Sequence, residues 1–173
     1  MFRLKRLFDK YKNYFSGWRK LLIEVLIIVL VFMGVRHYQS RDMSSGPAQP
    51  LHGTLLDNSK IDWAAYKGKP LLIHFWATWC PVCRLEENSI ESISQDYNVI
   101  SIAAWSEDTS AYMQKQGLSF PTLDDIDGVW ADRYGVTGVP ASFIISKEGN
   151  IEFAERGYSS EAGLRLRLWW IEL

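Results

Sequence analysis

The distribution of apolar residues divides the chain into two parts. Residues 21–35 form an apolar run that only Glu24 interrupts. From residue 51 onward, short apolar stretches alternate with polar and amphipathic stretches. A continuous apolar run is typical of a membrane helix, whereas alternating short stretches are typical of a globular domain. The pattern therefore predicts an N-terminal membrane helix followed by one folded domain, at residues 51–173.

Within this domain, the pattern predicts strands that alternate with helices. Residues 51–68 are weakly patterned and indicate a short hairpin or strand. The expected strands are residues 71–76, 99–105, 120–123, 139–145 and 151–156, and the expected helices are residues 81–97, 106–115, 129–134 and 161–172. The order of elements, which ends with a hairpin and a helix, predicts an α/β domain with a mixed β-sheet flanked by helices.

The N-terminal apolar run predicts a transmembrane signal anchor at residues 21–38. The run is somewhat shorter than the ~20 residues that a bilayer requires, so Trp18 on one side and His37 and Tyr38 on the other extend it into the interfaces. Glu24 lies near one end, from which a charged side chain can reach the headgroups. A cleaved signal peptide is the alternative, but no small-x-small cleavage site follows the run and the basic region before it is long.

Charge is distributed unevenly, although the formal net charge is only −1. Residues 1–20 carry an excess of basic side chains: Arg3, Lys5, Arg6, Lys10, Lys12, Arg19 and Lys20, against Asp9. By the positive-inside rule, this basic tail stays in the cytoplasm and the folded domain lies in the periplasm, across the inner membrane. From residue 51 onward acidic residues outnumber basic ones, so nothing indicates that the domain binds nucleic acid.

A linker is predicted between the anchor and the domain. Residues 39–50 are rich in Ser, Gly and Pro and have no hydrophobic periodicity. Such a composition is typical of a flexible segment. The linker is expected to tether the domain near the membrane surface.

Both cysteines of the chain lie in one Cys-x-x-Cys motif, directly after the strand expected at residues 71–76. With Cys80 at the start of the next helix and Cys83 one turn further, the two sulfurs can come within bonding distance. The free N–H groups and the dipole of the helix N-terminus favour a thiolate, which is the reactive species. Pro81 in the first turn costs no hydrogen bond. The spacing predicts a redox-active Cys80–Cys83 pair.

Metal binding by the cysteines is the alternative from another functional class. Cys80 and Cys83 could combine with His74 or His52. Structural zinc sites usually need four ligands, commonly two such cysteine pairs, and this chain has one pair. Copper(I) accepts two thiolates, so a membrane-tethered copper-binding module stays open. The acidic run at residues 124–127 indicates a solvated loop, with calcium binding as the weaker interpretation. No metal or other cofactor is expected.

These motifs resemble those of the thioredoxin superfamily. The resemblance rests on Trp79-Cys80-Pro81-Val82-Cys83 after an apolar strand and on Gly138-Val139-Pro140 before a later one, and it covers residues 51–173. The stretch at residues 75–80, together with Glu86, is similar to the TlpA/ResA/CcmG branch of membrane-tethered thiol–disulfide oxidoreductases. The Cys-Pro-Val-Cys form with His74 before it is most similar to the ScsD proteins, which are associated with suppression of copper sensitivity.

The resemblance implies a role for each cysteine. Cys80 would be the exposed nucleophile, which attacks a target disulfide or, when oxidised, is itself attacked, through a mixed disulfide. Cys83 would be the more buried resolving thiol. These roles make the Cys80–Cys83 disulfide the redox centre.

The resemblance also implies a substrate-binding surface. Val139–Pro140 would be a cis peptide that faces the cysteines and aims the Val139 N–H and C=O groups at an incoming extended peptide. Trp79 packs beside the cysteines in this interpretation and shapes the docking surface, and Pro81 belongs to the same surface. The substrates are thus expected to be protein thiols and disulfides.

Two titratable residues near the motif have two interpretations each. His74, six residues before Cys80, is either a proton relay for Cys83 or a hydrogen-bonded core histidine. Glu86, one helical turn past Cys83, is either a proton acceptor or an ordinary solvated helix residue. Position within the resembling motif favours a catalytic role for Glu86.

The function implied is that of a monomeric, membrane-anchored protein-disulfide reductase. Because the resembling branch is mostly reducing, electrons would come from a membrane electron-transfer protein of the DsbD/ScsB type. The alternative within the same class is a disulfide oxidase or isomerase.

Overall fold

The structure, a computed structural model, describes residues 18–31, 33–35 and 42–173. The chain divides into two compact units, residues 1–39 and residues 40–173. Residues 1–17 of the expected basic tail lie outside the described residues, as do residue 32 and residues 36–41 of the expected anchor and linker.

The N-terminal unit is helical over residues 18–31 and 33–35. Its apolar side chains are exposed, from 44% for Val29 to 66% for Ile28. Among the described residues, no helix combines the length and the apolar character that crossing a membrane demands. The anchor expected at residues 21–38 therefore stays a prediction.

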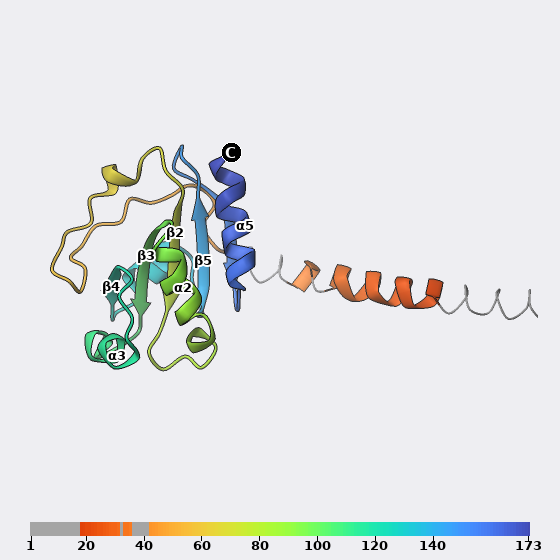
Figure 1. Ribbon diagram of the computed structural model, residues 1–173, viewed down its shortest axis with the longest axis horizontal. Helices are drawn as coiled ribbons and strands as arrows, with labels where there is room; N and C mark the ends of the chain where they lie inside the picture. Colours follow the sequence, from red (N-terminus) through yellow and green to blue (C-terminus); the bar gives the residue numbers. More distant parts are fainter. Residues whose placement is uncertain (1–17, 32, 36–41) are drawn as a thin grey trace, which may run out of the picture. The chain divides into compact units, whose positions relative to one another are not determined.

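The second unit is built on a six-stranded mixed sheet with the order β1-β6-β5-β2-β3-β4 (Figure 1). The strands are β1 Gly46–Pro47, β2 Leu71–Trp76, β3 Asn98–Ala104, β4 Thr122–Asp125, β5 Ala141–Ile145 and β6 Asn150–Arg156. Strands β2, β3 and β4 are parallel, whereas β5 is antiparallel to β2, and β6 is antiparallel to both β5 and β1. The expected mixed sheet is confirmed.

Helices and 3₁₀ turns cover both faces of this sheet. They are η1 Trp63–Tyr66, η2 Cys83–Leu85, α2 Glu87–Ser94, α3 Thr109–Gln116, α4 Val129–Arg133 and α5 Glu161–Glu172. The single helix expected at residues 81–97 is in fact two segments, because the Glu86 N–H group donates to the Cys83 carbonyl before the α-helical pattern begins. The break places Glu86 at the junction between η2 and α2.

Strand β2 lies at the centre of the sheet and is buried on both faces, as its sequence predicts. Leu71, Ile73 and Phe75 belong to an apolar cluster that includes residues of α4. Leu72 and Trp76 belong to the opposite cluster, which includes both cysteines and residues of α2, α3 and α5. Because side chains alternate along a strand, every second residue of β2 faces the cysteine side.

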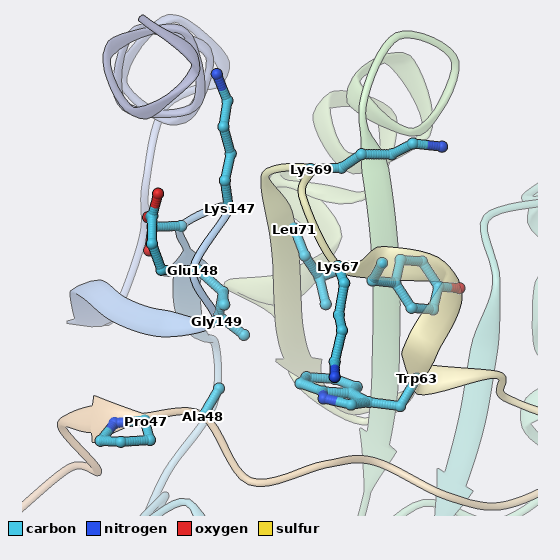
Figure 2. Close-up of a pocket in the computed structure, with 12 residues that line it drawn as sticks. Pro47, Ala48, Trp63, Lys67, Lys69, Leu71, Lys147, Glu148 and Gly149 are labelled. Carbon is cyan, nitrogen blue, oxygen red and sulfur yellow. The ribbon is translucent and has the colours of Figure 1, made fainter.

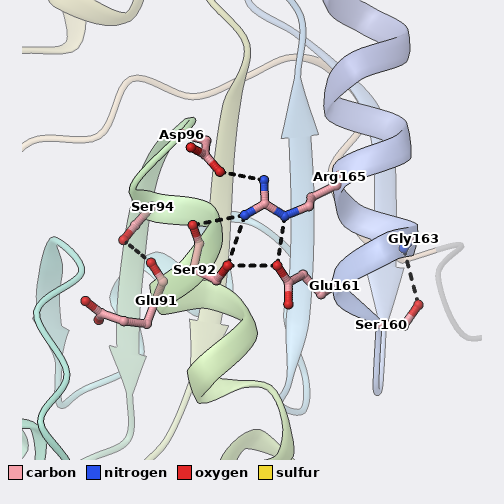
Figure 3. Close-up of polar contacts among 8 residues, drawn as sticks. All are labelled: Glu91, Ser92, Ser94, Asp96, Ser160, Glu161, Gly163 and Arg165. Carbon is pink, nitrogen blue, oxygen red and sulfur yellow. Dashed lines mark hydrogen bonds and ion pairs between the residues drawn. The ribbon is translucent and has the colours of Figure 1, made fainter.

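Helices α2 and α5 lie side by side on the cysteine side of the sheet (Figures 1 and 3). Arg165 of α5 joins them: its guanidinium lies 2.7 Å from the Asp96 carboxylate, beyond the end of α2, and 2.8 Å from that of Glu161. Ser92 of α2 donates to the same Glu161 carboxylate at 2.8 Å. These contacts hold the first turns of α5 against the end of α2.

The expected linker at residues 39–50 differs from the structure over its described part. Strand β1, Gly46–Pro47, pairs with β6, and Met43 and Ala48 are 6% and 9% exposed. Gly135 has a φ of +67°, and a Cβ there would collide with the Asp42 carbonyl. Edge pairing uses backbone groups, which a composition rich in Ser, Gly and Pro still provides, so residues 42–50 belong to the domain.

Candidate active site

The two cysteines form a disulfide at the carboxyl end of the central strand. Cys80 follows β2 by four residues and Cys83 begins η2, with 5.3 Å between their Cα atoms. The Cys83 N–H group donates to Cys80 Sγ at 3.1 Å. This donor stabilises negative charge on Cys80 when the pair is reduced. The expected Cys80–Cys83 pairing is confirmed.

The two cysteines are less exposed to solvent than the resemblance implies. Cys80 is 3% exposed and Cys83 is 1% exposed. The Sγ atom of Cys80 is bonded to Cys83 and lies 3.7 Å from the Val139 carbonyl oxygen. The expectation of an exposed Cys80 is therefore wrong for the disulfide form, because its sulfur is bonded to Cys83 and contacts Val139.

The loop before β5 completes the surface around the disulfide. The Val139–Pro140 peptide bond is cis, as the resemblance implies. Strand β5 begins only after Pro140, since proline has no N–H group for the ladder. Val139 packs against both apolar clusters while its carbonyl faces Cys80. The structure thus brings Cys80, Cys83, Val139 and Pro140 together.

Trp79 is the large exposed side chain beside the disulfide, with 57% of its surface accessible. Its indole N–H group donates to the Trp105 carbonyl at 2.8 Å. Trp105 follows β3 and has a φ of +51°, and the next residue, Ser106, accepts a hydrogen bond from the Thr78 N–H group at 3.1 Å. The sequence did not single out Trp105 or Ser106, although loops at the carboxyl ends of adjacent parallel strands commonly share a site.

A hollow of about 470 Å³ adjoins Trp79. Charged and aromatic side chains line it, including Arg84, Asp108, Tyr112 and Lys115. Pro81, the other residue expected on the docking surface, is exposed next to Cys80. The exposed surface around the disulfide is therefore formed by the motif, the 105–108 loop and α3.

His74 lies in the middle of β2 and is 2% exposed. In the strand register it is opposite Ser142 of β5, and its Nδ1 lies 3.0 Å from the Ser142 hydroxyl. Burial lowers the pKa of His74 to about 3, because the interior disfavours the charged imidazolium. His74 is therefore a neutral, hydrogen-bonded histidine on the cysteine side of the sheet.

His74 belongs to a row of polar residues that crosses five strands. The register aligns one residue of each strand: Glu155 of β6, Ser142 of β5, His74 of β2, Ser101 of β3 and Thr122 of β4. The Ser101 hydroxyl lies 2.7 Å from that of Thr122 and accepts a hydrogen bond from the Trp76 indole at 3.1 Å. Strand register is a tertiary property, so no sequence pattern indicates this row.

Glu86 faces His74 and is 1% exposed. One carboxylate oxygen, Oε1, accepts a hydrogen bond from the Ser159 N–H group. The other, Oε2, lies 3.9 Å from His74 Nε2 and has no hydrogen-bond partner among the described residues. Burial raises the pKa of Glu86 to about 7, and this effect outweighs the hydrogen bond from Ser159. The interpretation of Glu86 as a solvated helix residue is wrong.

The contact between His74 and Glu86 is not an ion pair, because the imidazole is neutral. At 3.9 Å it is also longer than a hydrogen bond. It brings a neutral imidazole and a carboxyl group with a near-neutral pKa together on the side of the sheet that carries the cysteines. A carboxyl group with this pKa can accept or release a proton at physiological pH, which is the property that a general acid or base needs.

Three further residues connect Glu86 to the surface. The Ser159 hydroxyl donates to Glu155 Oε2 at 3.0 Å, and Glu155 Oε1 lies 2.5 Å from the Arg167 guanidinium of α5. Glu155 is 14% exposed and Arg167 is 28% exposed. The sequence indicated none of them, since Ser159 lies 73 positions from Glu86.

A different set of side chains lines the opposite end of the sheet. A hollow of about 380 Å³ lies there, beside the start of β2 and the β5–β6 hairpin (Figure 2). It is lined by Trp63 and by three lysines, of which Lys147 reaches the Glu172 carbonyl at the end of α5. Leu71 and Gly149, which also line it, lie at the end of the sheet away from the cysteines.

The described residues contain no group of three or more His, Cys, Asp or Glu side chains that could hold a metal ion. His52, one of the candidate ligands, packs its ring edge-on against Trp130, with 4.8 Å between the centroids. In the acidic run, the Asp125 carboxylate accepts hydrogen bonds from the N–H groups of Trp130 and Ala131. Asp125 is therefore a buried helix-capping residue rather than a solvated one.

Comparison with known proteins identifies the family to which the chain belongs. The family model described as the AhpC/TSA family matches residues 46–154. A thioredoxin-like protein of Haemophilus influenzae is 28% identical over 168 residues, which cover 94% of this chain and 98% of that protein. The thiol-disulfide oxidoreductase ResA of Bacillus thuringiensis is 29% identical, over 76% of this chain and 85% of its own length.

A solved structure shows the same fold. The secreted Mycobacterium tuberculosis disulfide oxidoreductase homologous to Escherichia coli DsbE superposes with a TM-score of 0.62 at 27% identity, over 70% of this chain and 96% of that one. The family match, the fold and the cysteine pair are mutually consistent. The chain belongs to the AhpC/TSA family and is a thioredoxin-like thiol–disulfide oxidoreductase of the TlpA/ResA/CcmG kind.

Proposed function

We propose that the chain reduces disulfides of other proteins with its Cys80–Cys83 pair. The observation that carries this proposal is the disulfide-bonded pair followed, three residues after Cys83, by Glu86, a buried carboxyl group with a pKa of about 7. A dithiol needs a nearby proton acceptor when its second thiol reacts. Glu86 provides one within a single turn of Cys83.

The reaction begins when the Cys80 thiolate attacks a substrate disulfide. A bond forms between Cys80 Sγ and one substrate sulfur, and the other substrate sulfur leaves as a thiolate. Cys83 then gives its proton to the Glu86 carboxylate, and its thiolate attacks Cys80 Sγ. The mixed disulfide breaks, the second substrate thiolate leaves, and two electrons have passed from the enzyme dithiol to the substrate.

Substrates dock against Val139 and Trp79 in this proposal. The Val139 carbonyl faces Cys80, which suits an extended peptide that pairs with backbone groups and so depends little on side-chain sequence. Trp79, whose indole N–H group donates to the Trp105 carbonyl, offers an exposed apolar face beside Cys80, the residue that attacks the substrate. Because Cys80 is nearly buried, docking must open the Cys80–Val139 contact before exchange occurs.

The chain acts outside the cytoplasm, anchored to the inner membrane by residues 21–38. The basic residues before the apolar run support this orientation, and the M. tuberculosis protein of the same fold is secreted. An oxidising compartment supplies no electrons, so the chain receives them from a membrane electron-transfer protein of the DsbD/ScsB type. The likeness of Cys80-Pro81-Val82-Cys83 to ScsD proteins, with a role in copper tolerance, stays a prediction.

Insulin reduction by the full-length chain in detergent tests the proposal. We expect the dithiol form to precipitate insulin chains, and the Cys80→Ser variant to be inactive. The reduction potential, measured by equilibration with glutathione, tests the direction of transfer. A value near that of thioredoxin, about −270 mV, supports a reductase. A value near about −120 mV would instead assign the disulfide oxidase function.

A further inference from the structure

Glu155 and Arg167 form an ion pair that contacts the serine which binds Glu86. We propose that this pair sets the proton affinity of Glu86: the Glu155 carboxylate opposes ionisation of Glu86, and Arg167 limits that opposition. Glu155 and Arg167 are then positioning residues for proton transfer, although neither touches the cysteines. The inference rests on the proposed role of Glu86 in disulfide exchange and deepens it.

Ser159 is the structural link between the two carboxyl groups. Its backbone N–H group donates to Glu86 Oε1, and its hydroxyl donates to Glu155 Oε2 at 3.0 Å. Ser159 thus donates hydrogen bonds to both carboxylates, that of Glu86 and that of Glu155. In addition, Glu155 is opposite Ser142 in the strand register, and Ser142 contacts His74, which faces Glu86 Oε2. Hydrogen bonds connect Glu155 to Glu86 Oε1 through Ser159, whereas the row through Ser142 and His74 is an alignment of strand positions.

The Glu86 carboxylate contacts His74 and the Ser159 N–H group, and the charge of Glu155 acts on it. His74 of β2 is neutral, Cys83 of η2 is uncharged in the disulfide, and Glu155 of β6 is negative. Arg167 of α5 is the positive partner of Glu155, at 2.5 Å. His74 and Cys83 thus carry no charge near neutral pH in the oxidised chain, whereas Glu155 and Arg167 form an ion pair. Repulsion from Glu155 acts together with burial in raising the pKa of Glu86.

The two members of the pair have opposite effects on Glu86. Removal of the Glu155 charge leaves Arg167 unopposed, which stabilises the Glu86 carboxylate. Removal of the Arg167 charge takes a positive partner away from Glu155, which strengthens the repulsion between Glu155 and the same carboxylate. A purely structural role of the ion pair would not produce shifts of opposite sign.

The test is a pH titration of the Glu86 carboxyl group in the full-length oxidised chain. The side-chain carboxyl ¹³C signals of glutamate-labelled protein are followed by NMR, and the Glu86 signal is assigned from its loss in Glu86→Gln. We expect the Glu155→Gln variant to lower the midpoint by about 1 pH unit and Arg167→Gln to raise it by about as much. Arg165→Gln is the matched control, because Arg165 lies on the same helix but pairs with Asp96 and Glu161.

Arg167 also donates to the Gly163 carbonyl at 2.9 Å, so Arg167→Gln could fail to fold. In that case, comparison of the Glu86 midpoint in Glu155→Gln with that in Arg165→Gln is sufficient as the test. The amide oxygen of the Glu155→Gln variant still accepts the hydrogen bond from Ser159. Midpoints that do not move relative to Arg165→Gln, or that move in the same direction in both variants, overturn the inference. Insulin reduction is measured in parallel. If the chain reduces insulin but the predicted midpoint shifts are not observed, only this inference is contradicted. If the shifts are observed but the chain does not reduce insulin, only the proposed function is contradicted.

Discussion

His74 and Glu86 face each other at 3.9 Å inside the domain, with 2% and 1% of their surfaces exposed. Burial has opposite effects on the two groups: it lowers the pKa of the imidazole to about 3 and raises the pKa of the carboxyl group to about 7. Both shifts favour the uncharged form. The pair thus places a titratable carboxyl group inside the domain, one turn past Cys83, without burying a permanent charge.

Replacement of Glu86 by Gln should slow the resolving step, because Cys83 then loses its proton acceptor. We expect a decrease in the rate of exchange on the order of 100-fold near neutral pH. The limb of the wild-type pH–rate profile near pH 7, where Glu86 titrates, should disappear in the variant. Stopped-flow measurement of tryptophan fluorescence during reaction with a peptide disulfide reports this rate. An unchanged profile would assign the proton to another acceptor.

Glu86 should also make stability depend on pH. Its folded-state pKa of about 7 exceeds the ordinary value of 4.5, so the stability that it contributes is present below pH 4.5 and is lost as the pH rises through 7. The Glu86→Gln variant should therefore lose less stability than the wild type over this interval. Urea unfolding at a series of pH values measures the difference.

His74 should act in the opposite direction. Its folded-state pKa of about 3 lies below the ordinary value of 6.5, so its contribution is present above pH 6.5 and is lost as the pH falls toward 3. In His74→Asn, the amide keeps a polar atom near the Ser142 hydroxyl but does not titrate. Between neutral pH and pH 3, we expect the free energy of unfolding to decrease less in this variant than in the wild type. Equal acid sensitivity of the two proteins would contradict the low pKa.

Loss of Cys83 should trap mixed disulfides, since Cys80 can attack a substrate but no thiol releases it. The Cys83→Ser variant is expected to accumulate covalent, thiol-sensitive complexes with substrate proteins, visible on non-reducing gels. The Cys80→Ser variant is the matched control and should form far fewer. If the two patterns were reversed, Cys83 would be the attacking thiol.

Asp125 should stabilise the domain without affecting the chemistry. Its carboxylate accepts hydrogen bonds from Trp130 and Ala131, at 3.0 and 2.9 Å, and so caps the start of α4. We expect Asp125→Ala to cost about 2 kcal/mol in the free energy of unfolding, because two N–H groups lose their partner. The rate of exchange per folded molecule should not change. Denaturation and insulin assays on the same sample separate the two effects.

The sequence alone determined the elements whose signals are local. Strand β2, Leu71–Trp76, and helix α5, Glu161–Glu172, have the expected bounds, because an unbroken apolar run and a helical stretch are read from neighbouring residues. The Cys80–Cys83 disulfide was likewise predictable, since a spacing of three residues at a strand–helix junction is itself a local signal. The thioredoxin-like sheet followed from the order of these elements and the resemblance of the motifs.

Tertiary structure decided the environment of those elements. The composition of residues 39–50 predicted a linker where the structure has strand β1, Gly46–Pro47. The pairing of β1 with β6 uses backbone groups, which composition does not reveal. The burial of Cys80 depends on Val139, which is 59 positions away. The same holds for Glu86, whose partner Ser159 and neighbour His74 come from distant segments. Sequence names the groups that can react, but proton affinity and access are set by charges, dipoles and side chains that only folding brings into contact.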